Sequence, residues 1–255
     1  MIVAVVGATG LVGTKMLQIL EERNFPVTTL LPTASANSVG KTIVFKGQNI
    51  PVISLDEAVA AKPQIALFSA GGTVSLEWAP KFAENGTIVI DNSSAWRMDP
   101  SVPLVVPEVN PQAIQPSHNI IANPNCSTIQ MVVALQPLHQ TFQLKRVVVS
   151  TYQSVTGTGQ KAVQQMFDER AGKTPNRVYP HPIDLNILPH IDVFMADGYS
   201  KEEWKMMVET RKIMGLPKLK ITATTVRVPT VGGHSESINA SFEKSISVNA
   251  VREIL

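Results

Sequence analysis

The first part of the chain alternates between apolar runs of strand length and stretches with helical spacing. An apolar, β-branched run at residues 2–6 precedes a glycine turn, after which Met16, Leu17 and Leu20 recur at helical spacing. More strand-like runs lie at residues 27–31, 65–69 and 87–90, with helix-like stretches at 55–61 and 76–84. This alternation predicts an α/β fold whose N-terminal domain is a Rossmann-like, doubly wound parallel sheet.

The pattern changes after Asp91, where a segment dense in proline and asparagine predicts an ordered loop. Strand-like runs return in "RVVVSTYQSV", "LKITATTVRVP" and "SINASFEKSI". A charged stretch, "SKEEWKMMVETRKIMG", has acids at its start and bases and a glycine at its end, as the helix dipole and a glycine stop favour. We therefore predict a second, α+β domain at residues 125–255, after a first domain at residues 1–124. Because "VNAVREIL" resembles an amphipathic segment that has only begun, we expect the second domain to be truncated at its C-terminus.

Composition narrows the function class. The 255 residues carry a formal net charge of +2 with no basic block, which argues against nucleic-acid and membrane partners. A single cysteine excludes an internal disulfide framework and a cysteine-based zinc site, and we predict no metal site. The chain shows no signal-peptide pattern and no apolar run near the length of a membrane span, so we expect a cytoplasmic protein.

The glycine turn after the first strand is a candidate dinucleotide site. G-x-x-G-x-x-G at Gly7, Gly10 and Gly13 puts the amide groups of a helix start where a pyrophosphate can bind. The alternative is tight packing of strand against helix. Residues 28–41 contain no acid to bind an adenine ribose, which favours NADP, and Ser35, Ser38 and Lys41 are candidate 2′-phosphate ligands there, although that region has no arginine.

The only cysteine, Cys126, lies in "NPNCSTIQ", where a strand-like run ends and an apolar helix-like run begins. Capping by Asn125 or a neighbour would put Cys126 in the first turn of that helix, where the dipole lowers the pKa of a thiol. The same amides would stabilise an oxyanion on an attacked carbonyl. We interpret Cys126 as a nucleophile, against the alternative of a small buried hydrophobic residue.

A catalytic thiol needs a base, and five histidines compete for that role. His118 and His139 lie in settings typical of surface positions, and His181 and His190 lie beside prolines in a loop. His234, in "RVPTVGGHSES", follows two glycines at the end of a strand-like run and is our candidate; the alternative is an ordinary surface-loop histidine.

Taken together, these segments resemble aspartate-semialdehyde dehydrogenases, and most closely the bacterial enzymes of the Gram-positive type. The resemblance rests on "GATGLVG", "FSAGG", "DNSSAWR", "PLVVPEVN", "NPNCSTIQ", "STYQSVTG", "EEWKMMVET" and "RVPTVGGHSES", which span essentially the whole chain. It implies an NADP-dependent oxidoreductase that reduces β-aspartyl phosphate to aspartate β-semialdehyde and phosphate, reversibly. That reaction belongs to the biosynthesis of diaminopimelate, lysine, threonine and methionine. The resemblance also implies a homodimer or homotetramer.

The resemblance assigns roles to the residues that match the motifs. Cys126 would form the thioacyl intermediate, His234 would be the general acid/base, and Gln153 and Asn125 would complete the catalytic set. The substrate carboxylate would bind Arg227, its ammonium group Glu202, and its phosphate Arg97 and Lys205; each of these has a plain alternative, such as an ion pair within a helix for Glu202 and Lys205. The cofactor would contact Gly7, Thr9, Gly10, Leu11, Val12, Gly13, Ser35, Asn37, Ser38, Ser69, Gly71, Gly72, Asn92, Thr156, Gly157 and Gly159.

One departure and two rivals bear on this interpretation. Asn37 stands where many relatives have an arginine that reads the 2′-phosphate, which allows some use of NAD. N-acetyl-γ-glutamyl-phosphate reductases run the same chemistry, but they have a glycine before the cysteine and a tyrosine after it, unlike Asn125 and Ser127 here. A non-catalytic relative of the fold is the other alternative; such relatives tend to lose the cysteine or the histidine, and this chain has both.

Overall fold

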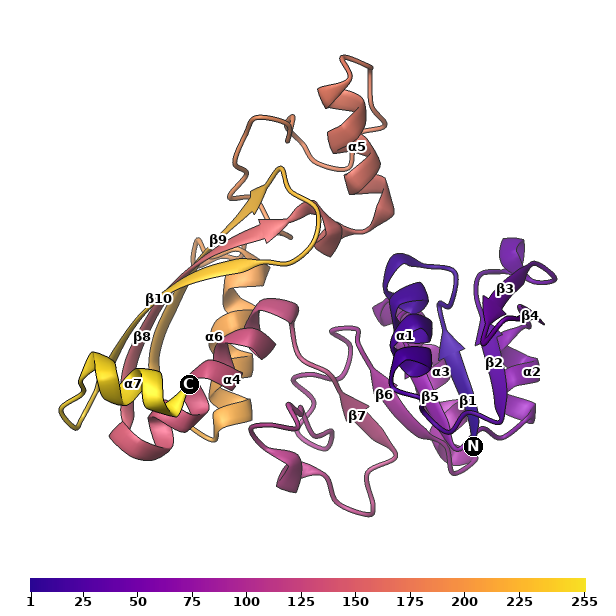
Figure 1. The fold of residues 1–255 in the computed structure, drawn as a ribbon, viewed down its shortest axis with the longest axis horizontal. Helices are drawn as coiled ribbons and strands as arrows, with labels where there is room; N and C mark the ends of the chain where they lie inside the picture. Colours follow the sequence, from indigo (N-terminus) through magenta and orange to yellow (C-terminus); the bar gives the residue numbers. More distant parts are fainter. The chain divides into compact units, whose positions relative to one another are not determined.

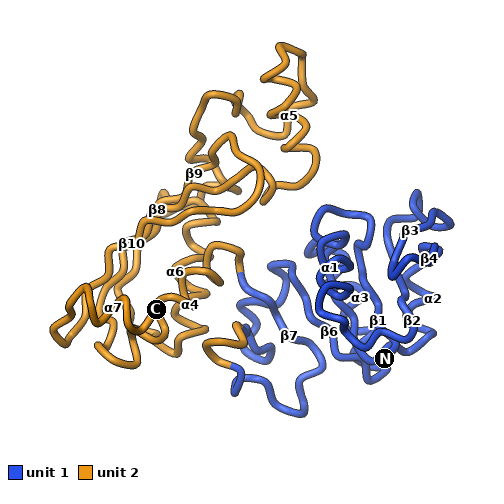
Figure 2. Tube along the Cα trace, viewed as in Figure 1, with its two compact units in different colours: residues 1–105, 111–124 blue, residues 106–110, 125–255 orange.

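A computed structural model describes all residues, Met1–Leu255, and the chain forms two compact units (Figures 1 and 2). Unit 1 comprises Met1–Val105 and Pro111–Pro124, and unit 2 comprises Val106–Asn110 and Asn125–Leu255. The chain enters unit 2 between Pro124 and Asn125, one residue before Cys126, and stays there to Leu255. The short return at Val106–Asn110 was not foreseen from the sequence.

Unit 1 is a parallel five-stranded sheet in the order β2-β1-β5-β6-β7, which confirms the predicted Rossmann-like fold. Its strands are β1 (Ile2–Val6), β2 (Thr29–Thr33), β5 (Ile65–Phe68), β6 (Ile88–Asp91) and β7 (Ile120–Ala122). Its helices are α1 (Leu11–Glu22), α2 (Leu55–Ala60) and α3 (Gly72–Glu84), with short 3-10 turns at Ala36–Ser38 and Pro111–Ala113.

β1 is buried on both sides, because helices cover both faces of this sheet. Val3 and Val5 pack in one core cluster with Leu17 and Leu20 of α1, while Ala4 and Val6 pack in another with Phe82 of α3. Such a strand has an unbroken apolar sequence instead of an alternating one. This arrangement makes the sheet doubly wound.

Two features of unit 1 differ from the sequence prediction. The second strand lies at Thr29–Thr33, two residues later than predicted, and includes Pro32; β2 is an edge strand, where proline is tolerated. A hairpin of β3 (Thr42–Phe45) and β4 (Gln48–Pro51) was not predicted. It turns at Lys46 and Gly47, which both have positive φ.

Unit 2 contains a three-stranded sheet in the order β10-β8-β9, together with helices on one of its faces. Strand β8 (Leu144–Ser154) runs antiparallel to β10 (Ser235–Phe242) and parallel to β9 (Lys220–Val228). Helices α4 (Cys126–Phe142) and α6 (Lys201–Met214) pack on this sheet and on each other. The remaining elements are a 3-10 turn (Val155–Thr158), α5 (Gln160–Arg170) and α7 (Val248–Ile254).

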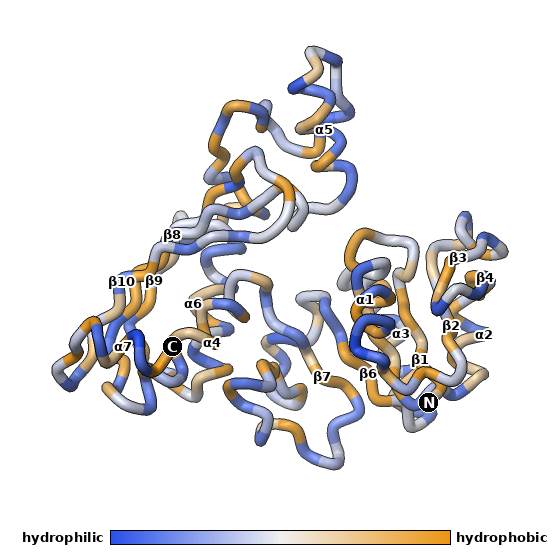
Figure 3. Tube along the Cα trace, viewed as in Figure 1, coloured by the Kyte–Doolittle hydropathy of each residue, from blue (hydrophilic) through white to orange (hydrophobic).

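The sheet of unit 2 changes character along its length. Val147 and Val149 of β8 and Ile221 and Ala223 of β9 form a buried apolar half. Farther along, β8 reads Ser150–Ser154 and becomes polar, a change visible in Figure 3 as the strands turn from orange to pale. Two of the candidate site residues, Gln153 on β8 and Arg227 on β9, lie in this polar half.

Helix α6 has the ends that its sequence predicted. Ser200 and Glu203 form a capping box at its start, and Gly215 ends it in the left-handed region at φ 66°. None of the helices of the protein combines the length and the apolar character needed to cross a membrane. No cluster of three or more histidine, cysteine, aspartate or glutamate side chains is arranged to hold a metal ion.

Candidate active site

Cys126 is the first residue of α4, as predicted, and its side chain is exposed. Asn125 is the N-cap, and its side-chain oxygen accepts hydrogen bonds from the backbone N–H groups of Ser127 (3.0 Å) and Thr128 (3.2 Å). The first turn of α4 contains no acidic residue. The dipole and amides of the helix start therefore act on the thiol without a neighbouring carboxylate in that turn, which favours the thiolate.

Two glutamates of α6 hold Asn125 in place. Its side-chain Nδ2 donates to Glu202 Oε1 (2.8 Å), and its backbone N–H donates to Glu209 Oε2 (2.7 Å). All three residues are buried, with Glu209 only 1% exposed. The residue before the nucleophile is thus fixed through both its backbone and its side chain.

Glu202 joins this arrangement to two further predicted residues. Gln153 Nε2 donates to Glu202 Oε1 (3.2 Å), and Lys205 Nζ lies 3.3 Å from Glu202 Oε2 on the same face of α6. Lys205 also pairs with Asp192 at 2.8 Å. Burial alone would lower the pKa of Lys205, but Glu202 and Asp192 outweigh it and raise the pKa, so Lys205 stays cationic.

Gln153 and Arg227 are register partners on β8 and β9, which brings them side by side. Arg227 Nη1 donates to Gln153 Oε1 (3.3 Å) and to the backbone oxygen of Ser154 (2.9 Å). Arg227 is 5% exposed, yet its Nε has no hydrogen-bond partner. A buried N–H without an acceptor is costly, and a bound carboxylate would satisfy it, so this geometry fits the predicted substrate clamp.

His234 lies just before β10 and is half-buried, not the exposed loop residue that the sequence alternative described. The backbone N–H of Ser154 donates to His234 Nδ1 (3.0 Å), so in the neutral ring Nε2 carries the proton. Burial, and then the charge of Arg227, lower the pKa of His234 below its usual value. The ring is therefore neutral near pH 7, which suits a general base.

Gly157, in the 3-10 turn after β8, has no space for a side chain. A Cβ at this position would lie 2.8 Å from Arg227 Nη1 and 3.3 Å from His234 Nε2. Gly157 thus lets the backbone pass close to both side chains. We predicted this residue as a cofactor contact, and the structure places it against the catalytic candidates of unit 2.

The predicted cofactor residues of unit 1 follow four neighbouring parallel strands. The glycine turn follows β1, Ser35–Ser38 follow β2, Ser69–Gly72 follow β5, and Asn92 follows β6. The carboxyl ends of parallel strands meet at one edge of the sheet, which is where α/β proteins bind nucleotides. The set is therefore brought together by topology.

The glycine turn itself serves both interpretations that the sequence left open. A Cβ at Gly13 would lie 2.1 Å from the backbone oxygen of Gly7, and one at Gly7 would lie 2.5 Å from that of Ser69, so both glycines are required for packing. At the same time Gly10 is the N-cap of α1, where no side chain caps the helix and the first turn has no acid. Thr9, Gly10, Leu11 and Val12 are exposed there, which fits a dinucleotide phosphate.

Two other predicted cofactor residues also start helices without a side-chain cap. Gly71 precedes α3 and Gly159 precedes α5, at φ 87° and 100°. Neither helix has an acid in its first turn. Their first amide groups lack a side-chain acceptor, as is typical of helix ends that bind anions.

Arg97, the predicted phosphate ligand of unit 1, is 8% exposed and anchored to two loops. Its Nε donates to the backbone oxygen of Asn123 (3.0 Å) and its Nη2 to that of Asn92 (3.0 Å). The side chains of Asn92 and Asn123 are themselves joined at 2.6 Å. Arg97 therefore ties the loop after β6 to the loop after β7.

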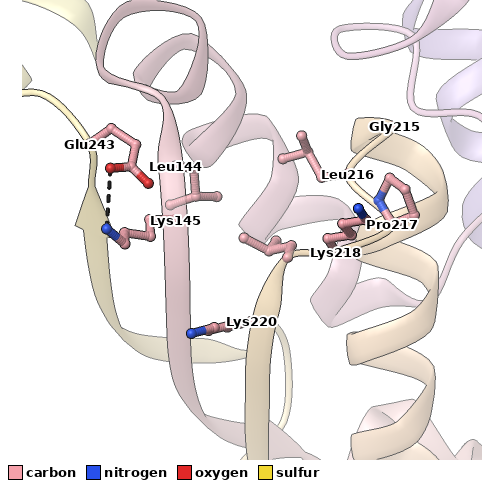
Figure 4. A pocket seen from close by; sticks show the side chains of 9 residues that line it. Leu144, Lys145, Gly215, Leu216, Pro217, Lys218, Lys220 and Glu243 are labelled. Carbon is pink, nitrogen blue, oxygen red and sulfur yellow. Dashed lines mark hydrogen bonds and ion pairs between the residues drawn. The ribbon is translucent and has the colours of Figure 1, made fainter.

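A cleft of about 430 Å³ in unit 2 lies elsewhere (Figure 4). It is formed where α6 ends and β8 and β9 begin, and Lys145, Lys218 and Lys220 line it. Lys145 pairs with Glu243 there at 3.2 Å. None of the candidate catalytic residues lines this cleft.

Sequence reasoning missed Glu209 and Asp192. Asp192 lies in an irregular segment, and no local pattern connects it with Lys205. Glu209 had a readable signal, because it follows Glu202 by seven residues and so falls on the same buried stripe of the helix. A glutamate on a buried stripe is rare unless it has a partner.

Comparison with known proteins agrees with this geometry. Residues 2–117 match the family described as semialdehyde dehydrogenase, NAD binding domain, and residues 135–255 match semialdehyde dehydrogenase, dimerisation domain. The chain is 56% identical to aspartate-semialdehyde dehydrogenase of Aquifex aeolicus, over 99% of this chain and 77% of that protein. It is 48% identical to the Legionella pneumophila enzyme of the same name, over 99% of this chain and 75% of that protein.

Solved structures give the same result. Aspartate semialdehyde dehydrogenase II of Vibrio cholerae complexed with ASA superposes with a TM-score of 0.96 at 45% identity, over 100% of this chain and 78% of that one. The Candida albicans aspartate semialdehyde dehydrogenase with NADP superposes with a TM-score of 0.78 at 26% identity, over 100% and 75%. The chain therefore belongs to the aspartate-semialdehyde dehydrogenase family.

Proposed function

We propose that this protein catalyses the reversible, NADP-dependent reductive dephosphorylation of β-aspartyl phosphate to aspartate β-semialdehyde and phosphate. The observation that carries this proposal is the continuous hydrogen-bonded set that links Asn125, Glu202, Gln153 and Arg227 beside an exposed thiol at a helix start. The likeness to relatives of that name, one of them complexed with ASA, supports it.

In the first step the Cys126 thiolate attacks the carbonyl carbon of the acyl phosphate, and the carbon–oxygen bond to phosphate breaks. This leaves a thioester on Cys126 and releases phosphate, whose charge Lys205 and Arg97 would balance. Amide groups of the α4 start would stabilise the oxyanion of the tetrahedral intermediate. The bound dinucleotide would supply the hydride that reduces the thioester.

Collapse of the reduced adduct then breaks the carbon–sulfur bond, and the semialdehyde leaves with the thiolate restored. His234 would transfer the protons that accompany attack and collapse. Arg227 would hold the substrate carboxylate through its unsatisfied Nε, and Glu202 would accept the ammonium group. The three charged groups of the substrate would thus meet four side chains of opposite charge, two of them on the phosphate.

For the cofactor we propose NADP, with some use of NAD. The absence of an acid in residues 28–41 and the exposed Ser35 and Asn37 after β2 support a 2′-phosphate. The Candida albicans neighbour solved with NADP supports the same choice. Asn37, in place of an arginine, makes the preference for NADP weaker than in relatives that have one.

The test is the phosphate-dependent oxidation of aspartate semialdehyde, followed by the absorbance of the reduced nicotinamide with NADP and NAD in separate assays. Turnover should require phosphate, and Cys126→Ala should abolish it while the affinity for NADP stays unchanged. N-acetylglutamate semialdehyde serves as the control substrate and should give no turnover. Turnover by Cys126→Ala, or preference for the control substrate, would show that the assignment is wrong.

We further propose that the protein self-associates through unit 2 as a homodimer or homotetramer, in the cytoplasm. The match of residues 135–255 to a family described as a dimerisation domain supports the first part. Light scattering after size exclusion would measure the mass against 27.6 kDa for one chain. A narrower kinship with the enzymes of the Gram-positive type stays a prediction.

A further inference from the structure

The backbone N–H of an N-cap residue needs an acceptor, and in three helices of this protein a glutamate side chain supplies it, in two different ways. In α2 and α6 the acceptor is the third helical residue, since Glu57 accepts from Ser54 N (2.7 Å) and Glu203 from Ser200 N (2.8 Å). These are capping boxes within one helix. They leave a carboxylate in the first turn.

Helix α4 differs at the same position. Its third residue is Thr128, which cannot reach back as a glutamate does, and the N–H of Asn125 instead donates to Glu209 Oε2 (2.7 Å), 84 residues away. The capping acid therefore comes from α6 and not from the first turn of α4. Thr128 is fully buried, so that turn has no room for a longer acid.

We propose that Glu209 is a positioning residue for Cys126, acting as a capping acid supplied by a second helix. It fixes the backbone directly before the nucleophile, because its carboxylate accepts the N–H of Asn125 (2.7 Å). The role of Cys126 in turnover rests on the proposed function; the placement of the thiol does not.

Packing alone does not account for a glutamate at this buried position. A carboxylate that is 1% exposed is expensive to desolvate, and a leucine of similar volume would pack at least as well between two helices. What leucine lacks is the acceptor for Asn125 N–H. The bond to the N–H of Asn125 thus gives the buried carboxylate a function that leucine cannot replace.

The sole cysteine makes a direct test possible, because iodoacetamide alkylation reports on Cys126 alone. Glu209→Leu should slow alkylation near neutral pH by about threefold to tenfold, since the thiol would move off the helix amides that favour the thiolate. The kcat for aspartate semialdehyde should fall about tenfold or more, with KM within about twofold, because Glu202 keeps its bonds to Gln153 and Lys205.

Two further variants separate position from charge. Glu209→Gln keeps an acceptor oxygen and should retain at least about half of the wild-type kcat and alkylation rate. Glu209→Asp keeps the charge but withdraws it by one carbon–carbon bond, so it should resemble Glu209→Leu; it replaces that variant if leucine prevents folding.

Glu169→Leu is the matched control, because Glu169 also accepts backbone N–H groups, from Ile183 (2.7 Å) and Asp184 (2.9 Å), in the same unit. It should lower the melting temperature and leave alkylation unchanged. Wild-type alkylation in Glu209→Leu would overturn the proposal in favour of a purely structural role. Faster alkylation would overturn it in favour of charge repulsion. An alkylation effect in a protein without turnover would uphold Glu209 and reject the proposed function.

Discussion

Replacing Glu236 by glutamine should stabilise this protein at alkaline pH and have little effect at acid pH. Glu236 lies on β10 opposite Thr151 of β8, and both of its carboxylate oxygens are shielded from solvent without a hydrogen bond. Burial raises the pKa of Glu236 from 4.5 to about 7. The side chain of Gln130 on α4 offsets a part of this rise, although its geometry falls short of a hydrogen bond.

The sign follows from proton binding. Between pH 4.5 and about 7 the folded protein keeps a proton on Glu236 that the unfolded chain has lost, so stability falls as the pH rises. At about 1.4 kcal/mol per pKa unit the full shift would correspond to about 3 kcal/mol. Because Glu236 is only partly buried, solvent screening reduces this figure, and we expect about 1 to 2 kcal/mol.

Glutamine cannot ionise, so Glu236→Gln removes the loss of stability that ionisation of Glu236 causes as the pH rises. Urea unfolding, followed by circular dichroism at about pH 5, 7 and 9, should show the variant gaining about 1 to 2 kcal/mol on the wild type between the lowest and highest pH. Glu243→Gln, which changes an exposed glutamate of the same unit, should show a small difference with no trend over this range. A difference between Glu236→Gln and wild type that is constant with pH would refute the reasoning.

Three other variants test the site. His234→Asn should lower kcat about 10²-fold to 10⁴-fold with little change in KM. In the wild type, the rate should fall on the acid side below pH 6.5, since burial and then Arg227 lower the pKa of His234, and a persisting acid limb in the variant would contradict the assignment. Lys205→Met should raise KM for phosphate about tenfold, and an unchanged KM would show that Lys205 only pairs with Glu202 and Asp192. Asn37→Arg should raise the ratio of kcat/KM for NADP over NAD about tenfold; no shift would show that this loop does not read the 2′-phosphate.

The sequence predicted the parts of the fold that depend on local pattern. The apolar run of β1, its glycine turn and the cap at Asn125 are local signals, and the structure confirms each of them. Strand β2 was misplaced because Pro32 argues against a central strand, and only the sheet order shows that β2 lies at an edge. The hairpin of β3 and β4 was not predicted, because strands of only four residues each give a weak pattern.

In the candidate site, too, some contacts could be predicted from local sequence and others could not. Glu202 and Lys205 share a helix face, so their proximity could be predicted from spacing alone. The contacts of Asn125 with Glu209, 84 residues away, and of Ser154 with His234, 80 residues away, depend on how α4, α6 and the sheet pack. No local pattern contains that information.

The position of α6 has a consequence for attempts to change the substrate of this protein. One helix carries Glu202 and Lys205, which would recognise the substrate, and Glu209, which holds the residue before the thiol. A shift or rotation of α6 that admits a longer or uncharged substrate would displace all three together. Selectivity and reactivity are therefore mechanically linked, and redesign of this pocket should proceed through Arg227 on β9, which is not part of that helix.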